Sequence, residues 1–568
     1  MAKWLAITIA GAVSLGSYEA GVLYELMRAI RTYNEAAVGD DKKIYVDVIT
    51  GASAGGMTAA IVSQRLMYDG ESLEGEFTNS LYQAWVERIS LMELVKMRRS
   101  EKKWHSLFSS DLVDSIGKDM LVKSLKKKGS GPHAAVEQIH GVAQTIRVGL
   151  ALTNLNGIDY MIPILGSDEG GFNYTSSVDQ KLFEVAADGQ TNSTLWEQMC
   201  HTAVGSGAFP AAFRPKGIQR SVDEFGDRLP ADPHLWIQGK SFVDWPGQSP
   251  TEFAFSDGGV LQNQPLGIAK NLVDAAVADR EGRLGSAAHC DASDRLYVFV
   301  TPHSVKSSAQ NLQAQKITIW NELKQLVNVY LRQAMFHDWI IAEGVNQNIN
   351  VLDTRASQLA DAIAQGEVDF ESLGKASGDL NAMLMPNREQ TRLSRLREQY
   401  SVEYQRVADT AGLQAAQAFV SALATLEAAA FLENRDKMRI VAVTANAQKE
   451  LAGSGLAAFV GFFKKSFRQH DYWVGRLKTR AYLQRSDVKR ILEVTRWPEE
   501  TSWETPLPNP SGVMLPLSNF QTAKAAFVPA IIMILLRPAV FVLLLLLTFA
   551  LGCGTWYLLL HVFHLLHR

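Results

Sequence analysis

The chain has 568 residues, which at about 150 residues per domain predicts three or four structural units. Lys and Arg total 56 against 59 Asp and Glu, so the formal net charge of −3 gives no general attraction to nucleic acid. Hydrophobic residues make up 47% and charged residues 20% of the chain, which excludes a largely disordered protein. The cysteines Cys200, Cys290 and Cys553 lie far apart, so we expect neither a disulfide scaffold nor a metal site.

The first 305 residues alternate strand-like and helix-like segments. Candidate strands are 4–10, 45–50, 145–152, 159–163, 252–255 and 295–301, and candidate helices are 17–32, 54–66, 194–203 and 265–277. Short apolar strands interleaved with helices predict an α/β sheet that is covered on both faces. We prefer a first strand to a secretory signal peptide at the N-terminus, because a single lysine precedes an apolar run that glycine and serine interrupt.

The rest of the chain divides by composition into three further regions. Residues 306–498 are rich in long helical patterns and predict a helical domain, and the proline-rich residues 499–524 predict a linker. Residues 525–568 predict a membrane anchor, because 538–560 contains 23 residues without a charge, enough to cross a hydrocarbon core of about 30 Å. The 12 apolar residues of 525–536 are too few to span, and they either lie in the interface or extend the same helix.

The residues that flank this anchor predict its orientation. Lys524 and Arg537 lie on its near side, and Arg568 is the one Lys or Arg on its far side. Positive charges gather on the cytoplasmic side of a membrane helix. We therefore expect the large N-terminal part to face the cytoplasm.

The sharpest local motif is a GxSxG sequence that runs from Gly51 to Gly55, with Ser53 at its centre. It follows the apolar candidate strand 45–50 and opens the candidate helix 54–66, which is the strand–turn–helix setting of a nucleophilic serine. The start of the helix offers unpaired N–H groups to a developing negative charge. The motif predicts Ser53 as a nucleophile, and a plain strand-to-helix turn is the alternative.

Two further motifs fit a serine nucleophile. Asp257, Gly258 and Gly259 follow a candidate strand, and an acid there faces the crevice at the carboxyl edge of the sheet. The glycine-containing turn from Gly11 to Gly16 joins the first strand to the first helix and offers N–H donors for an oxyanion hole.

In this order and context, the three motifs resemble those of the patatin-like phospholipase family: a glycine-rich oxyanion loop, then GxSxG, then DG[GA]. The stretches SYEAGVLYEL at 17–26, TNLNG at 153–157 and GSGAFPAAF at 205–213 agree with it. The resemblance covers about the first 300 residues. Residues 470–477, HDYWVGRL, also resemble C-terminal extensions of some bacterial members.

The resemblance implies a patatin-like three-layer α/β/α catalytic domain over 1–305, a Ser–Asp dyad, no catalytic histidine, no metal and no cofactor. Carried over by position, Ser53 is the nucleophile and Asp257 is the base. We expect a membrane-anchored serine acyl hydrolase that cleaves membrane (phospho)lipid esters on the cytoplasmic face of a bacterial inner membrane. The alternatives are an inactive membrane scaffold, or a neutral-lipid esterase, thioesterase or acyltransferase.

One motif departs from the family pattern, and one alternative triad remains. The usual loop GGGxRG is GAVSLG here, with Val13 in place of a glycine and Leu15 in place of the arginine. We expect the main-chain N–H groups of Gly11, Val13 and Gly16 to form the oxyanion hole, either weakened or in another conformation, because valine resists positive φ angles. His303 follows the last candidate strand and is the alternative base in a Ser–His–Asp triad.

Overall fold

A computed structural model describes residues 2–515 except 97–100, 102–105, 125–141, 164–170, 187–192, 225–241, 245–247, 281–294, 304–318, 385–388, 431, 433–436, 455–457 and 514. The predicted membrane anchor 525–568 and the end of the predicted linker lie outside these residues. Among the helices that are described, none combines the length and the apolar character needed to cross a bilayer.

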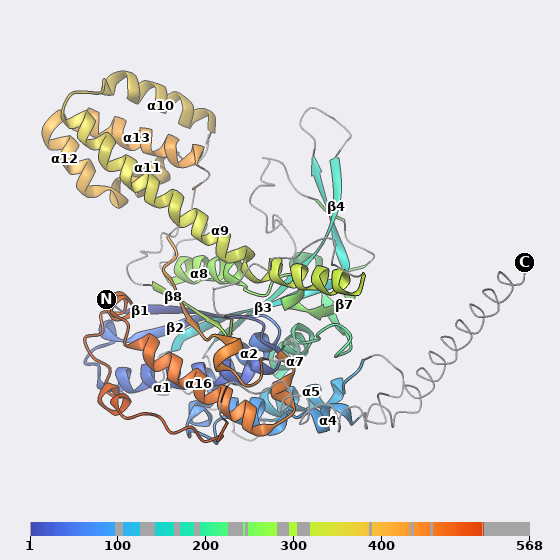
Figure 1. Ribbon diagram of the computed structural model, residues 1–568. Coiled ribbons are helices and arrows are strands. Elements are labelled where there is room, and N and C mark those ends of the chain that lie inside the picture. The colour runs from blue at the N-terminus through green and yellow to red at the C-terminus, as the bar shows by residue number, and fades with distance from the viewer. Residues whose placement is uncertain are drawn as a thin grey trace, which may run out of the picture.

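The described residues build a mixed nine-stranded sheet, shown in Figure 1. The strands are β1 (Lys3–Ile9), β2 (Ile44–Gly51), β3 (Val142–Pro163), β4 (Gly171–Ala186), β5 (Lys216–Arg220), β6 (Phe242–Asp244), β7 (Thr251–Asp257), β8 (Arg295–Thr301) and β9 (Ile440–Thr444). They follow the order β5-β7-β3-β2-β1-β8-β9, and β4 and β6 pair with β3 beside this path. Neighbouring strands are parallel along the series β3-β2-β1-β8-β9. The other pairs are antiparallel: β4, β6 and β7 each pair with β3, and β5 pairs with β7.

Helices cover both faces of the sheet, which confirms the predicted α/β class. Alternate residues of β1 point to opposite faces, as the two-residue period of a strand requires. Leu5, Ile7 and Ile9 join the core under α1 (Gly16–Ala36), α2 (Ala54–Tyr68) and α7 (Ser193–Ser206). Ala6 joins the opposite core under α8 (Leu266–Arg280), and Figure 1 shows α8 on that other side of the sheet.

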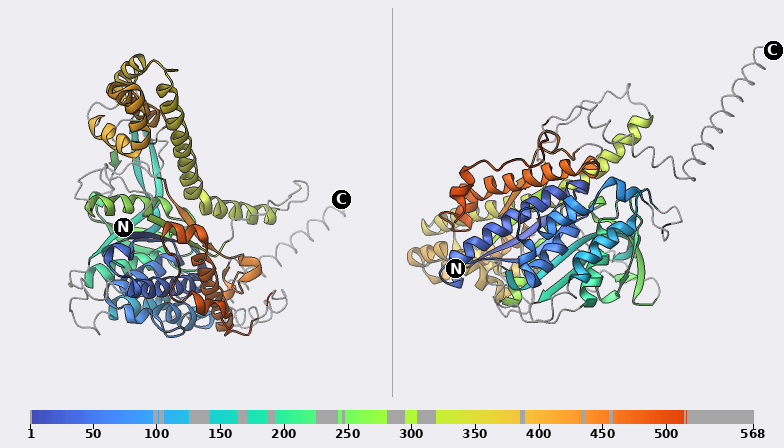
Figure 2. Two further views of the ribbon diagram at one scale, coloured as in Figure 1. Left: turned by 90° about the vertical axis from the view of Figure 1, so that its left-hand side faces the viewer. Right: turned by 90° about the horizontal axis from the view of Figure 1, so that it is seen from below.

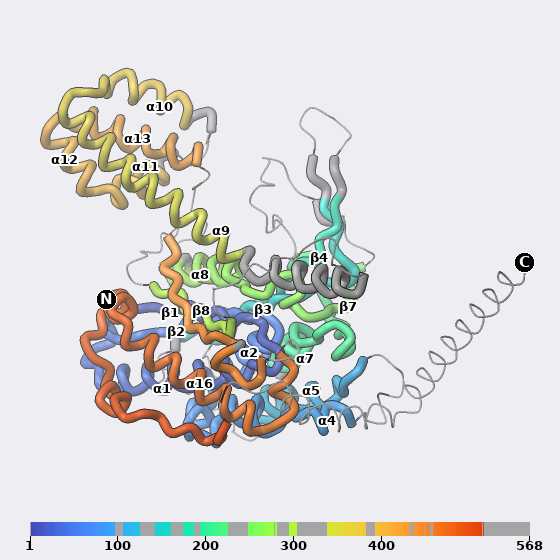
Figure 3. Tube along the Cα trace, viewed as in Figure 1, coloured from blue at the N-terminus to red at the C-terminus, as the bar shows by residue number. Residues whose placement is uncertain are grey.

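A second group of helices has its own apolar core. It consists of the latter part of α9 (Ile319–Ala364) with α10 (Phe370–Leu384), α11 (Glu389–Gln399), α12 (Ser401–Ala411) and α13 (Leu413–Ala429). Figure 3 shows these helices apart from the sheet, and we call residues 347–437 the helical lobe. The two ends of the lobe lie next to each other. The Asn346 side-chain amide donates to the Met438 carbonyl oxygen and accepts from the Met438 N–H, both at 2.8 Å.

After the lobe the chain returns to the sheet. Strand β9 pairs with β8, and α16 (Lys465–Leu483) lies alongside α1 (Figure 2). The two helices touch through their backbones, because a Cβ on Gly21 would lie 2.0 Å from the Tyr472 carbonyl oxygen and one on Gly475 would lie 2.2 Å from that of Tyr18. The sheet and its helices, which we call the α/β body, thus draw on residues on both sides of the predicted boundary at 305, and that boundary stays a prediction.

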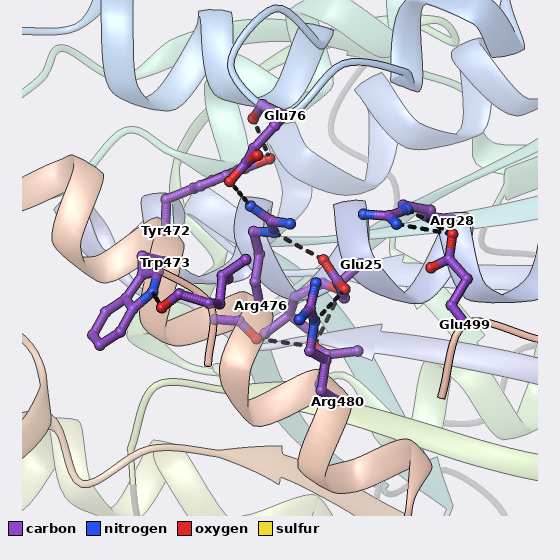
Figure 4. A network of polar contacts seen from close by, with 12 residues as sticks. Glu25, Arg28, Glu76, Tyr472, Trp473, Arg476, Arg480 and Glu499 are labelled. Carbon is purple, nitrogen blue, oxygen red and sulfur yellow. Dashed lines mark hydrogen bonds and ion pairs between the residues drawn. The ribbon is translucent and has the colours of Figure 1, made fainter. Parts of the chain in front are cut away.

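A buried ionic network joins α1 to the C-terminal residues (Figure 4). The fully buried Glu25 accepts from Nε of Arg476 at 2.8 Å and from Nε of Arg480 at 2.6 Å. Arg28, further along α1, pairs with Glu499 at 2.8 Å. A buried carboxylate that lost both arginines would be strongly destabilising, so these contacts fix the position of α16 on α1.

The short helices are α3 (Ser80–Tyr82), α4 (Leu91–Val95), α5 (Ser110–Gly117), α14 (Ala447–Glu450) and α17 (Ser486–Ile491). The short helical turns are η1 (Val13–Leu15), η2 (Asp40–Lys42), η3 (Gly70–Leu73), η4 (Gln83–Arg88), η6 (Lys118–Lys123), η8 (Val222–Glu224), η10 (Gly258–Val260), η12 (Val460–Phe462) and η13 (Glu500–Glu504). Turn η1 precedes α1, and η10 follows β7 at the same edge of the sheet as the start of α2.

Candidate active site

Ser53 lies at a sharp turn between β2 and α2, as the GxSxG motif predicts. Its φ of 55° and ψ of −125° are strained for a non-glycine residue. The flanking glycines are required by close approach: a Cβ on Gly51 would lie 2.3 Å from the Gly55 carbonyl oxygen, and one on Gly55 would lie 2.5 Å from the carbonyl oxygens at the end of β1. The turn presents the Ser53 hydroxyl at the carboxyl edge of the sheet.

Asp257 ends β7 and lies directly beside Ser53. The Ser53 Oγ donates to Asp257 Oδ2 at 2.6 Å, and the Gly259 N–H donates to Asp257 Oδ1 at 2.7 Å. Gly258 has no room for a side chain, because a Cβ there would lie 2.1 Å from the Ala151 carbonyl oxygen of β3. The structure therefore brings together the two residues that the sequence predicts as nucleophile and base.

Burial raises the pKa of Asp257 to about 7, although the hydrogen bonds from Ser53 and Gly259 act to lower it. Loss of hydration penalises the charged carboxylate more than its neutral form. A carboxylate with a pKa near neutrality is well matched to accept a proton and return it at the pH of a cell.

Two residues that sequence reasoning did not single out support the site, Ser206 at the Ser53 turn and Asn263 at the Gly11–Gly16 loop. Ser206 Oγ accepts the Ser53 N–H at 2.9 Å and donates to the Ala151 carbonyl oxygen at 2.7 Å, which ties the turn to β3. The main-chain carbonyl oxygen of Asn263 accepts the Gly11 N–H at 3.1 Å. Ser206 falls in the GSGAF stretch at 205–209, so the sequence carried a signal for its region but none for its role.

The loop from Gly11 to Gly16 approaches the site at two of the three residues predicted to form an oxyanion hole, because a Cβ on Gly11 would lie 3.0 Å from Ser53 Cβ and Val13 lines the same pocket as Ser53. The Gly11 N–H is bonded to Asn263, and the Gly16 N–H is directed to the carbonyl oxygens of Val13 and Ser14. Val13 lines the pocket that contains Ser53 and has a φ of 52°. Among the described residues, the N–H groups of Val13 and Ala54 have no acceptor. In this respect the N–H groups of Val13 and Ala54 differ from those of Gly11 and Gly16, which have partners.

An apolar pocket opens from Ser53 between α2, η4, α5 and α7. Its lining consists of Val13, Ser53, Ala54, Met57, Ala84, Trp85, Ile89, Val113, Ile116, Ala203, Val204, Gly207, Phe209, Phe213 and Phe462. Aliphatic and aromatic side chains dominate this list, and Ser53 supplies the hydroxyl. A pocket of this composition suits a hydrocarbon chain attached to a reacting carbonyl.

His303 has a different environment from the one a triad requires. Its backbone N–H donates to the Thr301 hydroxyl at 3.3 Å, and burial lowers the pKa of its imidazole. Within the described part of the chain, no hydrogen bond joins a histidine to Ser53 or Asp257. The observed contact is the direct serine–aspartate bond.

Comparison with known proteins relates part of the chain to a family. The family model described as patatin-like phospholipase matches residues 7–270, which include Ser53 and Asp257. The protein y4iI of Sinorhizobium fredii, described as uncharacterized, is 22% identical over 331 residues, a match that covers 46% of this chain and 44% of that protein. The chain therefore spans less than half the length of this relative.

Proposed function

Because residues 7–270 belong to the patatin-like phospholipase family, we propose that this protein is an acyl hydrolase that cleaves lipid esters through Ser53 and Asp257. The family supports lipid hydrolysis in general terms. The observation that carries the assignment to these residues is the 2.6 Å hydrogen bond from Ser53 Oγ to Asp257 Oδ2 at the end of an apolar pocket.

In the proposed reaction, Asp257 Oδ2 takes the proton of Ser53 Oγ as this oxygen attacks the ester carbonyl carbon. The tetrahedral oxyanion accepts hydrogen bonds from the N–H groups of Val13 and Ala54. Asp257 then gives its proton to the departing alcohol, and an acyl-enzyme remains on Ser53. Water, deprotonated by Asp257, attacks this ester, and the proton returns to Ser53 as the fatty acid leaves.

The substrate class follows from the pocket. Met57, Trp85, Ile89 and Phe209 are among the side chains that surround the space next to Ser53, and they suit an acyl chain better than a polar group. A membrane lipid supplies such a chain beside an ester carbonyl.

The first test is covalent labelling of the full-length protein with a fluorophosphonate, together with hydrolysis of p-nitrophenyl butyrate. We expect wild type to be labelled and active, and Ser53→Ala to be neither, with an unchanged melting temperature. Ser63→Ala is the matched control, because Ser63 Oγ is buried and donates only within α2, to the Ala59 carbonyl oxygen at 2.7 Å. Wild type without labelling or turnover contradicts the proposal and favours the scaffold; turnover by Ser53→Ala contradicts the assignment of the nucleophile.

We also propose that residues 538–560 anchor the protein in a membrane, with the α/β body on the cytoplasmic side. The support is the uncharged 23-residue run, and the chemistry agrees, because an anchored enzyme meets its lipid substrate at high effective concentration. Full-length protein should remain in the membrane pellet after alkaline carbonate washing. Release into the wash contradicts the anchor and leaves the hydrolase proposal intact.

A further inference from the structure

We propose that residues 458–463 of the C-terminal region complete the active site, and that Ser14 and Arg468 are positioning residues which hold the Gly11–Gly16 loop and the pocket wall in place. The inference deepens the proposed function, because it assigns part of the same site to a segment that the family match at 7–270 does not include.

Ser14 provides the first contact between the loop and this segment. Its side chain is fully buried, and its Oγ donates to the Ala458 carbonyl oxygen and accepts the Gly461 N–H at 3.1 Å. The fit is close, because a Cβ on Gly461 would lie 2.5 Å from Ser14 Oγ. A single hydroxyl thus joins the oxyanion loop to residues more than 440 positions further along the chain.

The loop requires such support because of the backbone at Val13. A φ of 52° is disfavoured for a β-branched residue and persists only where the surroundings enforce it. Val13 is directly followed by Ser14, so the two hydrogen bonds of Ser14 act one residue away from the strained position. They hold the Val13 N–H, the proposed oxyanion donor, at the edge of the pocket.

Arg468 provides the second contact, between the segment and the pocket wall. Its guanidinium is buried and donates to the carbonyl oxygens of Gly461 at 2.9 Å and Phe462 at 3.3 Å. The same group donates twice to the Val86 carbonyl oxygen, at 3.0 and 2.9 Å. Val86 belongs to η4, whose Trp85 lines the pocket, and Phe462 lines the same pocket.

Aromatic packing provides the third contact. The ring of Phe459 lies 5.5 Å from that of Phe209, 5.9 Å from that of Phe462 and 6.0 Å from that of Phe108. Phe209 and Phe462 line the pocket, so the segment contributes both a wall and the residue that packs behind that wall.

Asp471 holds the turn that precedes this segment, because its carboxylate accepts the N–H groups of Ala452 at 2.7 Å and Gly453 at 2.9 Å.

The test uses the full-length protein and p-nitrophenyl butyrate as the probe substrate. Loss of one oxyanion donor lowers kcat by about a hundredfold or more, so a displaced donor should have a measurable part of that effect. We expect Ser14→Ala to lower kcat at least about tenfold, with KM changed less than about twofold, while the control Ser63→Ala keeps both values. A Ser14→Ala enzyme with wild-type kcat overturns the inference.

A double-mutant cycle tests whether the two sides act through each other. Gly461→Ala should also lower kcat, because its Cβ meets Ser14 Oγ. When Ser14→Ala removes that oxygen, the nearest atom to the added methyl group is the Cβ of residue 14 at 3.1 Å, so Gly461→Ala should lower kcat less in this background than in wild type. Losses that simply multiply contradict the proposed contact.

Hydrogen–deuterium exchange separates a failure of this inference from a failure of the proposed function. Ser14→Ala should raise the exchange rate of the amides at 12–16 while leaving those of α2 unchanged, whether or not the protein hydrolyses esters. Unchanged exchange at 12–16 overturns the inference even for an active enzyme. Raised exchange in a wild type that lacks turnover keeps the structural contact and rejects the hydrolase.

Discussion

Val13 and Ser53 both have positive φ angles, of 52° and 55°, and both line the same pocket. Such conformations cost about 1–3 kcal/mol each for residues other than glycine. Strain at these two positions, together with a Val13 N–H that has no acceptor in the part of the chain that the structure describes, supports the proposed catalytic role. An inactive scaffold would gain stability by relaxing either position.

The raised pKa of Asp257 predicts the pH dependence of hydrolysis. The base acts as a carboxylate, and burial raises its pKa to about 7, so kcat/KM should fall about tenfold per pH unit below 7. The measurement is kcat/KM for p-nitrophenyl butyrate from pH 5 to pH 9. A flat profile between pH 5 and pH 7 contradicts Asp257 as the base.

The same burial predicts that Asp257 reduces stability at neutral and alkaline pH. Below its unfolded pKa near 4 both states are protonated and the residue costs nothing. As the pH rises from about 4 to 7 the unfolded chain ionises while the folded carboxyl retains its proton, so the free energy of unfolding decreases. Asp257→Asn, which cannot ionise, should therefore be more stable than wild type at pH 8.

The expected gain exceeds about 1 kcal/mol at pH 8, because one pKa unit corresponds to about 1.4 kcal/mol. It should shrink towards pH 4. Urea unfolding of both proteins at pH 8 and at about pH 4.5 measures the difference, and equal stability at pH 8 contradicts the burial argument.

At the level of elements, the crossing of α1 and α16 depends on two glycines. A Cβ on Gly475 would lie 2.2 Å from the Tyr18 carbonyl oxygen, so Gly475→Ala must push the helices apart. Overpacking of this kind costs about 1–3 kcal/mol. We expect a lower melting temperature by scanning calorimetry.

Gly378 in α10 is the matched control, since no atom lies within 4 Å of the Cβ that an alanine would add there. Gly378→Ala should raise stability by about 0.5–1 kcal/mol, because alanine is the better helix former. A Gly475→Ala protein as stable as Gly378→Ala shows that the close crossing is not required.

The sequence predicted the elements whose signal is local. The strand expected at 295–301 is β8, and the turn of the GxSxG motif lies between β2 and α2 as expected. The sequence does not predict strand β9, which falls in the region 306–498 that is expected to be helical. Its five residues lie in helix-rich sequence, and they pair with a strand about 140 positions earlier. Tertiary pairing of this kind leaves no local pattern.

In the candidate site too, the sequence predicted the features that have a local signal and missed the contacts between distant residues. The proximity of Ser53 and Asp257 followed from the rule that ligands bind at the carboxyl edge of an α/β sheet. The roles of Ser206 and Ser14 did not follow, because each depends on a partner that only the folded chain brings near. The catalytic assignment of Ser53 and Asp257, and of the oxyanion donors, stays a prediction until the variants are measured.

At the level of the whole molecule, the helical lobe is an insertion whose two ends meet at Asn346 and Met438. Its core is separate from the one around Ser53. We expect that replacing 350–434 by a short Gly-Ser linker leaves a folded α/β body that hydrolyses p-nitrophenyl butyrate within about threefold of the wild-type rate. Loss of activity in this variant contradicts the independence of the lobe.

A truncation gives the contrasting result. A chain that ends at residue 437 keeps the lobe but lacks β9 and α16, so it exposes the edge of β8 and the buried face of α1. We expect this protein to be insoluble or inactive, although it contains all of the family match at 7–270. An active, soluble truncation shows that the C-terminal residues are dispensable.

The position of β9 also bears on how the protein is made. About 140 residues separate the end of β8 from the end of β9, and a ribosome adds about 5–20 residues per second. For roughly 7–30 seconds the nascent chain therefore has a complete β8 with no partner for its outer edge. An unpaired apolar edge readily joins another chain. Faster translation between codons 301 and 440, or a chaperone that covers β8 during synthesis, should raise the yield of soluble protein. Translational pauses between these codons should lower it.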